Sequence, residues 1–291
     1  MLHRIQFEDM TLTVNDHGSE LCSFTVAGRE YIWQGENGSW MGHSPILFPV
    51  VGALKDNSIE YEGETLHIFK HGFAARKNFS VDRVSDSEIR LVLHADEETL
   101  AVYPFDFTLA VTFRIIEKGF SVTYEISNNG ERTMPFCIGG HPGMALPMED
   151  GYRFEDYIVR FEKEETGEIA VCPDGGIIRG TKIYDGMQKD FFRLDHSDYD
   201  REDALIFTSL KSRKAQLINE KTGHGVEIDF SDFPVLSFWT MPHKTSSYIC
   251  LEPWHGMNAF DDETGRFEDK PHAILLKGND TASLTFSVKL V

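Results

Sequence analysis

The sequence predicts an all-β protein, a large antiparallel β-sandwich with few short helices. Apolar and polar residues alternate through most of the chain, and this is the period of strands that bury one face. Turn signals such as NNG, DGG and KTGHG recur at short intervals. The 22 phenylalanines favour strands as well, because aromatic side chains fit a pleated surface. Many strands joined by short turns are typical of a sandwich or barrel.

The alternation is clearest in the middle and at the end of the chain. Residues 106–115 place Phe107, Leu109 and Val111 on one face, and residues 120–127 repeat the pattern after the turn EKG, which predicts a hairpin. The same alternation extends over 87–95, 215–230 and 281–290. No stretch keeps a helical period over three turns, so we expect few and short helices. The acidic stretch 195–203 lacks the glycine and final glutamate of a calcium loop, and we expect a solvated loop there.

Length and charge narrow the classes of function. With 291 residues the chain can bury a sizeable core, and we expect one domain over residues 1–291 because no repeat or low-complexity linker interrupts it. The 47 acidic and 28 basic residues give a net charge of −19, which repels phosphate backbones and anionic lipids. We therefore expect neither nucleic-acid nor membrane partners, whereas a neutral small molecule meets no obstacle.

The chain shows no signal for export. Its N-terminus has no apolar core of signal-peptide length, and no apolar run approaches about 18 residues. The four cysteines, at positions 22, 137, 172 and 250, show no paired spacing, so we expect free thiols and a cytoplasmic protein. The sequence leaves the oligomeric state open between a monomer and a homodimer.

Four segments interrupt the alternation with glycine or proline beside polar residues. They are SPILFPVVGALKD (44–56), KHGFAARKNF (70–79), GGHPGMALP (139–147) and ICLEPWHGMNAFDD (249–262). Strand ends and loops are where a rigid sandwich carries its functional residues. The chain has no GxSxG, P-loop, dinucleotide-binding or CxxC motif, so these four segments form the candidate site.

Two ionisable residues stand out in these segments. His141 follows two glycines, which we expect to let the backbone approach a ligand closely, and precedes Pro142, which fixes the direction of the imidazole. Glu252 ends an apolar strand and precedes Pro253 and Trp254. Burial would raise the pKa of this carboxyl toward neutrality, which suits a general base. An aromatic face beside a carboxylate is also a common way to hold a sugar.

Other polar and aromatic residues complete the candidate set. His71 and Arg76 form a second polar group, and Trp239 is expected in the core or in the wall of a pocket. His67 and His71 share a strand face, but no third ligand follows at a recognisable spacing, so we predict no metal site. Three more histidines near these segments are expected to be structural: His43, His243 and His255.

With these segments in order, the chain resembles the aldose 1-epimerase (galactose mutarotase-like) family, and in particular its LacX-like bacterial branch. The stretches DALIFTSLKSR and DFPVLSFWTMP match as well, so the resemblance covers residues 44–256. It implies a galactose mutarotase-like supersandwich that holds a sugar in an open cleft on one sheet face. It also implies that His141 is the general acid, Glu252 the general base and His71 a ligand of sugar hydroxyls, with Asp203 as a loose match for a sugar-contacting aspartate.

The implied reaction interconverts the α and β anomers of a hexose or a related sugar. The ring opens at the C1–O5 bond and closes again from the other face, so the 1-hydroxyl loses a proton while O5 gains one. A base and an acid must therefore lie within about 3 Å of these two oxygens. Glu252 would take the O1 proton and a protonated His141 would donate to O5. The reaction requires no cofactor or metal, because no electrons are transferred.

Two alternative functions stay open. Ala53 stands where the family usually has an arginine, which leaves Lys55 as the nearest cation and favours a carbohydrate-binding protein without turnover, whereas the presence of both His141 and Glu252 favours an enzyme. A hexose-phosphate mutarotase would instead need a cluster of cations, for which the candidates are Lys55, Lys70, Arg76 and Lys77. A glycosidase would need two well-placed carboxylates, and only Glu252 stands out.

Overall fold

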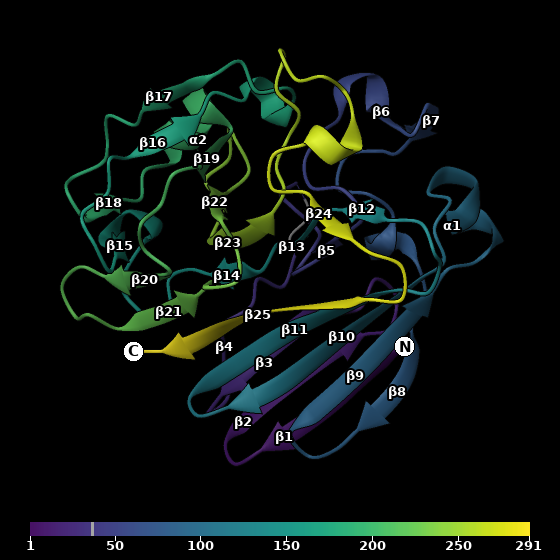
Figure 1. Cartoon of the computed structure of the whole chain (residues 1–291). Helices are drawn as coiled ribbons and strands as arrows, with labels where there is room; N and C mark the ends of the chain where they lie inside the picture. The colour runs from purple at the N-terminus through teal and green to yellow at the C-terminus, as the bar shows by residue number, and fades with distance from the viewer. Residues whose placement is uncertain (36–37) are drawn as a thin grey trace.

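The structure is a computed structural model that describes residues 1–35 and 38–291. It confirms the prediction of an all-β sandwich, because antiparallel sheets make up most of the fold (Figure 1). The largest sheet has nine strands, in the spatial order β18 (Phe191–Arg193), β15 (Tyr157–Phe161), β20 (Lys214–Asn219), β21 (Gly225–Asp229), β25 (Thr281–Leu290), β11 (Gly119–Asn128), β10 (Phe107–Ile116), β9 (Glu88–His94) and β8 (Ser80–Val84).

The second large sheet has eight strands and carries the candidate site. Its spatial order is β17 (Thr181–Ile183), β16 (Glu168–Ala170), β19 (Ala204–Phe207), β22 (Val235–Trp239), β23 (Tyr248–His255), β13 (Ile138–Gly140) and β5 (Ile46–Leu47). The eighth strand, β14 (Gly143–Ala145), also pairs with β23. Strand β23 therefore has β22 on one side and the β13–β14 segment on the other.

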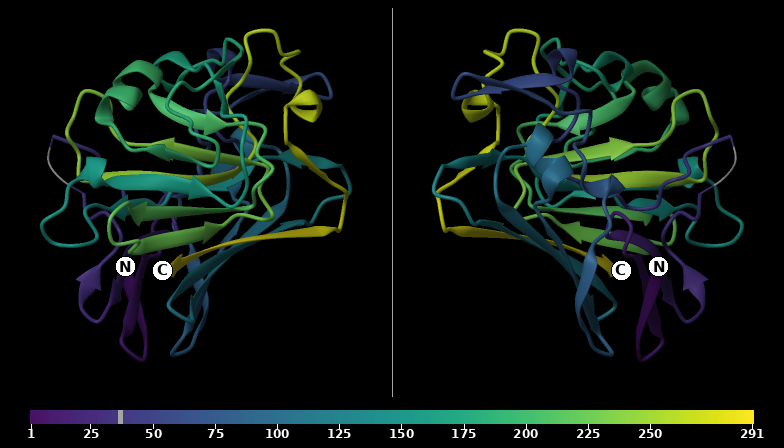
Figure 2. Two further views of the ribbon diagram at one scale, coloured as in Figure 1. Left: turned by 90° about the vertical axis from the view of Figure 1, so that its left-hand side faces the viewer. Right: turned by 90° about the vertical axis from the view of Figure 1, so that its right-hand side faces the viewer.

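Smaller elements surround these two sheets. A four-stranded sheet contains β1 (Leu2–Phe7), β2 (Met10–Asn15), β3 (Glu20–Val26) and β4 (Arg29–Glu30), and it lies opposite the β8–β11 part of the nine-stranded sheet (Figure 2). Two further pairs are β6 (Ser58–Tyr61) with β7 (Glu64–His67), and β12 (Met134–Phe136) with β24 (Ile274–Leu276). The helices are α1 (Glu97–Val102), α2 (His196–Glu202) and the 3-10 turns η1 (Lys55–Asn57), η2 (Ala74–Arg76), η3 (Phe154–Asp156), η4 (Pro173–Gly175) and η5 (Phe267–Asp269).

The alternating stretches form the strands that they predict. Strands β10 and β11 pair from Phe107 opposite Asn128 to Ile116 opposite Gly119, and the predicted apolar face of β10 is buried. Residues 281–290 form β25, 87–95 contain β9, and 215–230 contain the β20–β21 hairpin. The four cysteines are free thiols, as expected. Among the described residues, no helix combines the length and the apolar character needed to cross a membrane.

The prediction for the acidic stretch 195–203 was wrong, because this stretch forms helix α2 instead of a solvated loop. Asp195 caps the helix by accepting a hydrogen bond from the backbone N–H of Ser197 at 2.8 Å. Asp198 is buried and accepts hydrogen bonds from Tyr184 and Arg201. Local polar contacts thus form this two-turn helix without the apolar period that would have revealed it.

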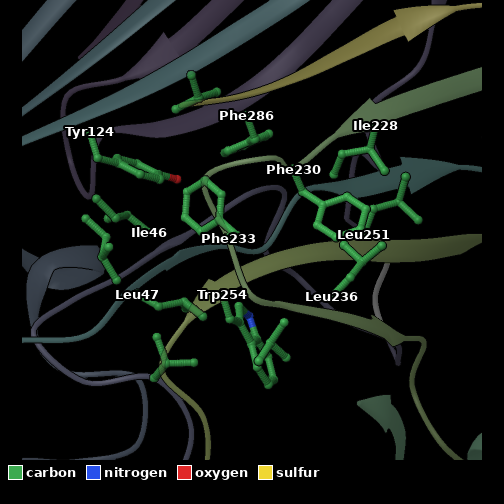
Figure 3. Close-up of a cluster of buried hydrophobic side chains, with 14 of the residues drawn as sticks. Ile46, Leu47, Tyr124, Ile228, Phe230, Phe233, Leu236, Leu251, Trp254 and Phe286 are labelled. Atoms are coloured by element: carbon green, nitrogen blue, oxygen red, sulfur yellow. The ribbon is translucent and has the colours of Figure 1, made fainter. Parts of the chain in front are cut away.

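A layer of buried side chains joins the two large sheets (Figure 3). Tyr124 of β11 and Phe286 of β25 extend from the nine-stranded sheet toward Leu236 of β22 and Leu251 of β23. Successive residues of a strand point to opposite faces, so the neighbour of Leu251, Glu252, is directed to the other face of the eight-stranded sheet. The core therefore fixes which side chains are available to a site on that face.

Backbone packing at Gly72 provides a test of how the second segment is held. Gly72 has φ +74°, and a Cβ there would lie 2.1 Å from the carbonyl oxygen of Phe48. We expect Gly72→Ala to lower the free energy of unfolding by more than about 2 kcal/mol, because it adds a backbone clash to the left-handed strain. Gly28→Ala is the matched control, since Gly28 has φ +81° and nothing within 4 Å of a Cβ. Equal losses for the two variants in chemical denaturation would show that Phe48 does not constrain this segment.

Candidate active site

All four interrupted segments meet in one cavity of about 400 Å³. The first segment contributes Pro45 and Leu47, and the second contributes Lys70, His71 and Arg76. The third contributes His141, and the fourth contributes Glu252, Trp254 and Asn258. Trp239 of β22 and Asp203, which follows α2, complete the group of sequence candidates in the lining. The interruptions of the alternation thus mark one site.

Strand register brings His141 and Glu252 together. On β23, Trp254 pairs with Gly139 of β13 and Cys250 pairs with Gly143 of β14, and both pairs belong to the same register. In that register, His141 lies across from Glu252. The backbone N–H of Leu251 donates to the carbonyl of Pro142 at 3.0 Å and keeps the connection between β13 and β14 against β23.

The two side chains are in direct contact. The Nε2 atom of His141 lies 3.1 Å from the Oε2 atom of Glu252, and the exposed fractions of the side chains are 12% and 2%. Oε2 of Glu252 and Nδ1 of His141 are buried, and neither has a hydrogen-bond partner within the described part of the chain. Buried polar atoms are usually paired, so unpaired atoms in a cavity indicate a place where a ligand binds.

Burial sets the protonation of this pair. It raises the pKa of Glu252 well above its usual range and lowers the pKa of His141 to about 3, since each group loses hydration of its charged form. The pair therefore holds one proton, and burial favours a neutral carboxyl beside a neutral imidazole. This differs from the protonated His141 that we expected from the sequence.

The glycines beside His141 accommodate neighbouring aromatic rings. A Cβ at Gly139 would lie 2.7 Å from the indole ring of Trp254, and a Cβ at Gly140 would lie 2.9 Å from the ring of Phe286. The two glycines therefore make room for neighbouring aromatic side chains, and the close approach of a ligand to this backbone stays a prediction.

Aromatic rings enclose the imidazole of His141. The ring of Trp40 lies 5.0 Å from it and that of Trp239 lies 5.6 Å from it, measured between centroids. Trp239 is thus part of the cavity wall. The sequence analysis missed Trp40, which lies four residues before the first interrupted segment. Its only signal was a tryptophan close to a glycine and a histidine in SWMGHSP.

His71 is held as a neutral hydrogen-bond donor. Burial lowers its pKa well below the usual value, so the ring is uncharged. Its Nδ1 atom accepts a hydrogen bond from the backbone N–H of Gly52 at 3.2 Å, which leaves the proton on Nε2. The His71 ring lies 6.0 Å from that of His141. Its N–H group is therefore available to a ligand hydroxyl in the same cavity.

The candidate cations separate into two groups. Lys55 does not line the cavity, because its ammonium group donates to the backbone carbonyls of Asp261 at 2.6 Å and Glu263 at 3.2 Å. Lys77 pairs instead with Asp96 and Glu98. Lys70 and Arg76 do line the cavity, and we therefore remove Lys55 from the candidate site.

Two carboxylates accompany these two cations. Asp174 and Asp203 line the same cavity, and a Cβ at Gly175 would lie 2.6 Å from Asp203 Oδ2 and 2.7 Å from Lys70 Nζ. These two charged groups therefore lie close to each other beside Gly175. Burial raises the pKa of Asp203, and the nearby charge of Lys70 opposes this shift. The lining thus has cations and acids in similar number.

Comparison with known proteins supports the resemblance that the segments indicated. The model of the family described as aldose 1-epimerase matches residues 1–288. Protein LacX of Lactococcus lactis subsp. lactis is 30% identical, with each chain covered in full. A galactose mutarotase related enzyme from Lactobacillus acidophilus is 30% identical with a TM-score of 0.93, over 100% of this chain and 97% of that one. A galactose mutarotase-like protein from Lactobacillus casei is 28% identical with a TM-score of 0.93, and both chains are covered in full. The chain belongs to the aldose 1-epimerase family.

Proposed function

We propose that this protein interconverts the α and β anomers of a neutral aldose and that His141 and Glu252 transfer the protons. The observation that carries the proposal is the buried contact of 3.1 Å between an imidazole nitrogen and a carboxyl oxygen at a ligand-sized cavity. The O1 and O5 atoms of a pyranose share one carbon, so they require an acid and a base that lie close together. Two adjacent protein atoms satisfy this requirement.

The pair needs one proton for the complete reaction. One group receives the proton of the 1-hydroxyl while the other gives its proton to O5, and the C1–O5 bond breaks to leave an open-chain aldehyde. After rotation about the C1–C2 bond, O5 attacks the opposite face of the carbonyl and both protons return. Because the pair begins and ends with one proton, either group can begin as the acid. Burial favours Glu252 as the initial donor, and proton transfer across the 3.1 Å contact gives the opposite assignment.

The surrounding residues support binding of a sugar. Trp40, Trp239 and Trp254 provide apolar faces in the cavity, and these suit the C–H surfaces of a pyranose. The Nε2–H group of His71 and the side chains of Arg76 and Asp203 provide donors and acceptors for hydroxyl groups. These assignments extend the site beyond the two residues that move protons.

The charge of the lining favours a neutral sugar over a hexose phosphate. Of the four candidate cations, Lys55 and Lys77 are engaged elsewhere. The remaining two, Lys70 and Arg76, share the cavity with Asp174 and Asp203. A phosphate group would approach these acids as well as the cations, and the chain as a whole has a charge of −19. A hexose phosphate is therefore the second candidate, supported by the two cations.

Substitution of either central residue is expected to remove most of the activity. Glu252→Gln and His141→Asn keep the approximate volume of each side chain but remove its ability to exchange protons, so each should lower kcat by about 10²–10⁴-fold. Polarimetry with freshly dissolved sugar measures the rate. His94→Asn is a control, because His94 is exposed on β9 and bonded to Thr108. Rates close to wild type in either central variant would contradict the assignment, and an inactive wild-type protein that binds sugar would favour a carbohydrate-binding function.

The pH dependence tests whether the pair shares one proton. Burial lowers the pKa of His141 to about 3 and raises that of Glu252, so the singly protonated pair persists across the interval between these values. We expect kcat/KM to fall on the acid side only as pH approaches about 3, where the pair takes up a second proton. On the alkaline side it falls where Glu252 ionises. A loss of activity with a midpoint near the usual imidazole value of 6.5 would contradict this prediction.

Salt dependence separates the two substrate classes. We expect the affinity for glucose to change little with ionic strength, because hydroxyl recognition involves no net charge. Glucose 6-phosphate should bind no more tightly than glucose at low salt. Calorimetric titration at two salt concentrations measures both affinities, with Lys70→Gln as the variant that removes one cation. Tighter binding of the phosphate, weakened by salt and by Lys70→Gln, would instead establish the second candidate.

A further inference from the structure

A second group of ionisable side chains lies outside the lining of the cavity that contains His141 and Glu252. Glu20 and Cys22 of β3 and His43 of the β4–β5 connection offer a carboxylate oxygen, a sulfur and a ring nitrogen that all lie within 4.8 Å of one another. All three side chains are partly exposed, and those of Glu20 and His43 have exposed fractions of 20% and 24%. The three side chains therefore lie near the surface.

Strand β3 is distorted where it carries this group. In the pairing of β2 with β3, Thr13 lies opposite Ser23 and the next residue, Val14, lies opposite Leu21, so Cys22 has no partner in the register. This extra residue is a β-bulge, which redirects side chains and is frequent beside functional sites. The bulge leaves Cys22 and Glu20 directed toward the β4–β5 connection.

The distance between His43 and Glu20 is close to that between two ligands of a tetrahedral ion. Nδ1 of His43 lies 3.7 Å from Oε1 of Glu20, which is too long for a hydrogen bond. Nitrogen and oxygen ligands at about 2.1 Å from Zn²⁺ lie about 3.4 Å apart in tetrahedral geometry. Nδ1 of His43 is also a buried atom with no hydrogen-bond partner in the described chain. A ring nitrogen that has no hydrogen-bond partner is available to bind a metal ion.

The hydrogen bonds of Glu20 fix this arrangement in advance. Its Oε1 atom accepts hydrogen bonds from the backbone N–H groups of His43 at 2.7 Å and Ser44 at 3.1 Å. These bonds hold the β4–β5 connection against β3 and place the imidazole beside the carboxylate. Metal-binding carboxylates are commonly oriented by such outer hydrogen bonds. The bonds hold Oε1, the oxygen that lies 3.7 Å from Nδ1 of His43, in place beside the ring.

We propose that Glu20, Cys22 and His43 form a zinc site that joins β3 to the segment carrying Trp40, with the fourth position open to water. Thiolate, imidazole and carboxylate are the ligand types that Zn²⁺ takes in proteins. Trp40 precedes His43 by three residues and its ring lies 5.0 Å from that of His141. An ion bound by these three residues would hold the Trp40 segment, which forms one wall of the cavity. The ion would not contact His141 or Glu252.

The structure contains another group of possible ligands, which the test must separate from this one. His141, Cys250 and Glu252 also offer ligand atoms within 4.8 Å of one another. Cys250 is fully buried and is absent from the cavity lining, so an ion has no open path to its sulfur. Accessibility therefore favours the Glu20–Cys22–His43 group.

Co²⁺ is the probe for the site, because cobalt bound to a thiolate has a charge-transfer band in the near ultraviolet. We expect the reduced, metal-free protein to bind one Co²⁺ with this band, Cys22→Ser to lose the band, and His43→Gln to bind at least about tenfold more weakly. Cys250→Ala is the matched control and should keep the band and the affinity. Metal-free melting temperatures close to wild type show that the variants are folded.

Zn²⁺ supplies a second measurement that does not depend on a spectrum. The ion should raise the melting temperature of the wild-type protein as its concentration exceeds the Kd, and should leave that of Cys22→Ser unchanged. A charge-transfer band that survives in Cys22→Ser but disappears in Cys250→Ala would place the ion at the catalytic pair and overturn the proposal. Wild-type protein without a thiolate band at saturating Co²⁺ would overturn it as well. Neither result depends on the proposed epimerase activity.

Discussion

The buried contact between His141 and Glu252 is the interaction on which the rest of the site depends. The two ionisable groups lie 3.1 Å apart and are buried away from water. A buried pair of charges costs free energy unless further hydrogen bonds stabilise both ions. The described residues provide no such bonds to Oε2 of Glu252 or to Nδ1 of His141. Burial therefore leaves one proton on the pair, and one proton is what the proposed exchange between O1 and O5 requires.

The sandwich fold maintains this contact through strand register. Ser237 on β22 pairs with Glu252 on β23, and His141 lies across from Glu252 on the other side of that strand. The opposite face of β23 is fixed by Leu251, which packs in the core between the large sheets (Figure 3). A slip by one residue would direct Glu252 into the core, so the core that stabilises the fold also selects the face on which the candidate site lies.

Much of this architecture could be predicted from the sequence, because alternating apolar and polar residues directly indicate a strand with one buried face. The hairpin of β10 and β11 and the long strand β25 are examples. Interruptions of the alternation correctly predicted which segments line the cavity. The contact between His141 and Glu252 could not be predicted from spacing, because it depends on pairing between strands far apart in the chain. The resemblance to a family supplied their association.

The differences from prediction have local causes. Helix α2 depends on the cap of Asp195 and on buried contacts of Asp198, and neither leaves a periodic pattern in the sequence. Lys55 belongs to the first segment, but its ammonium group donates hydrogen bonds to two backbone carbonyls outside the cavity. Trp40 lies outside the four segments, and only the folded β4–β5 connection brings it to His141.

Trp40 helps to set the protonation of His141 because its ring keeps water away from the imidazole. The pKa of His141 is low because water is excluded from its ring, and the rings of Trp40 and Trp239 form part of that enclosure. If the Trp40 segment moved outward, water would reach the imidazole and the charged form of the pair would gain stability. The contacts of Glu20 with residues 43 and 44 oppose this movement. The segment that shields His141 and Glu252 is thus anchored to β3, in a sheet to which neither residue belongs.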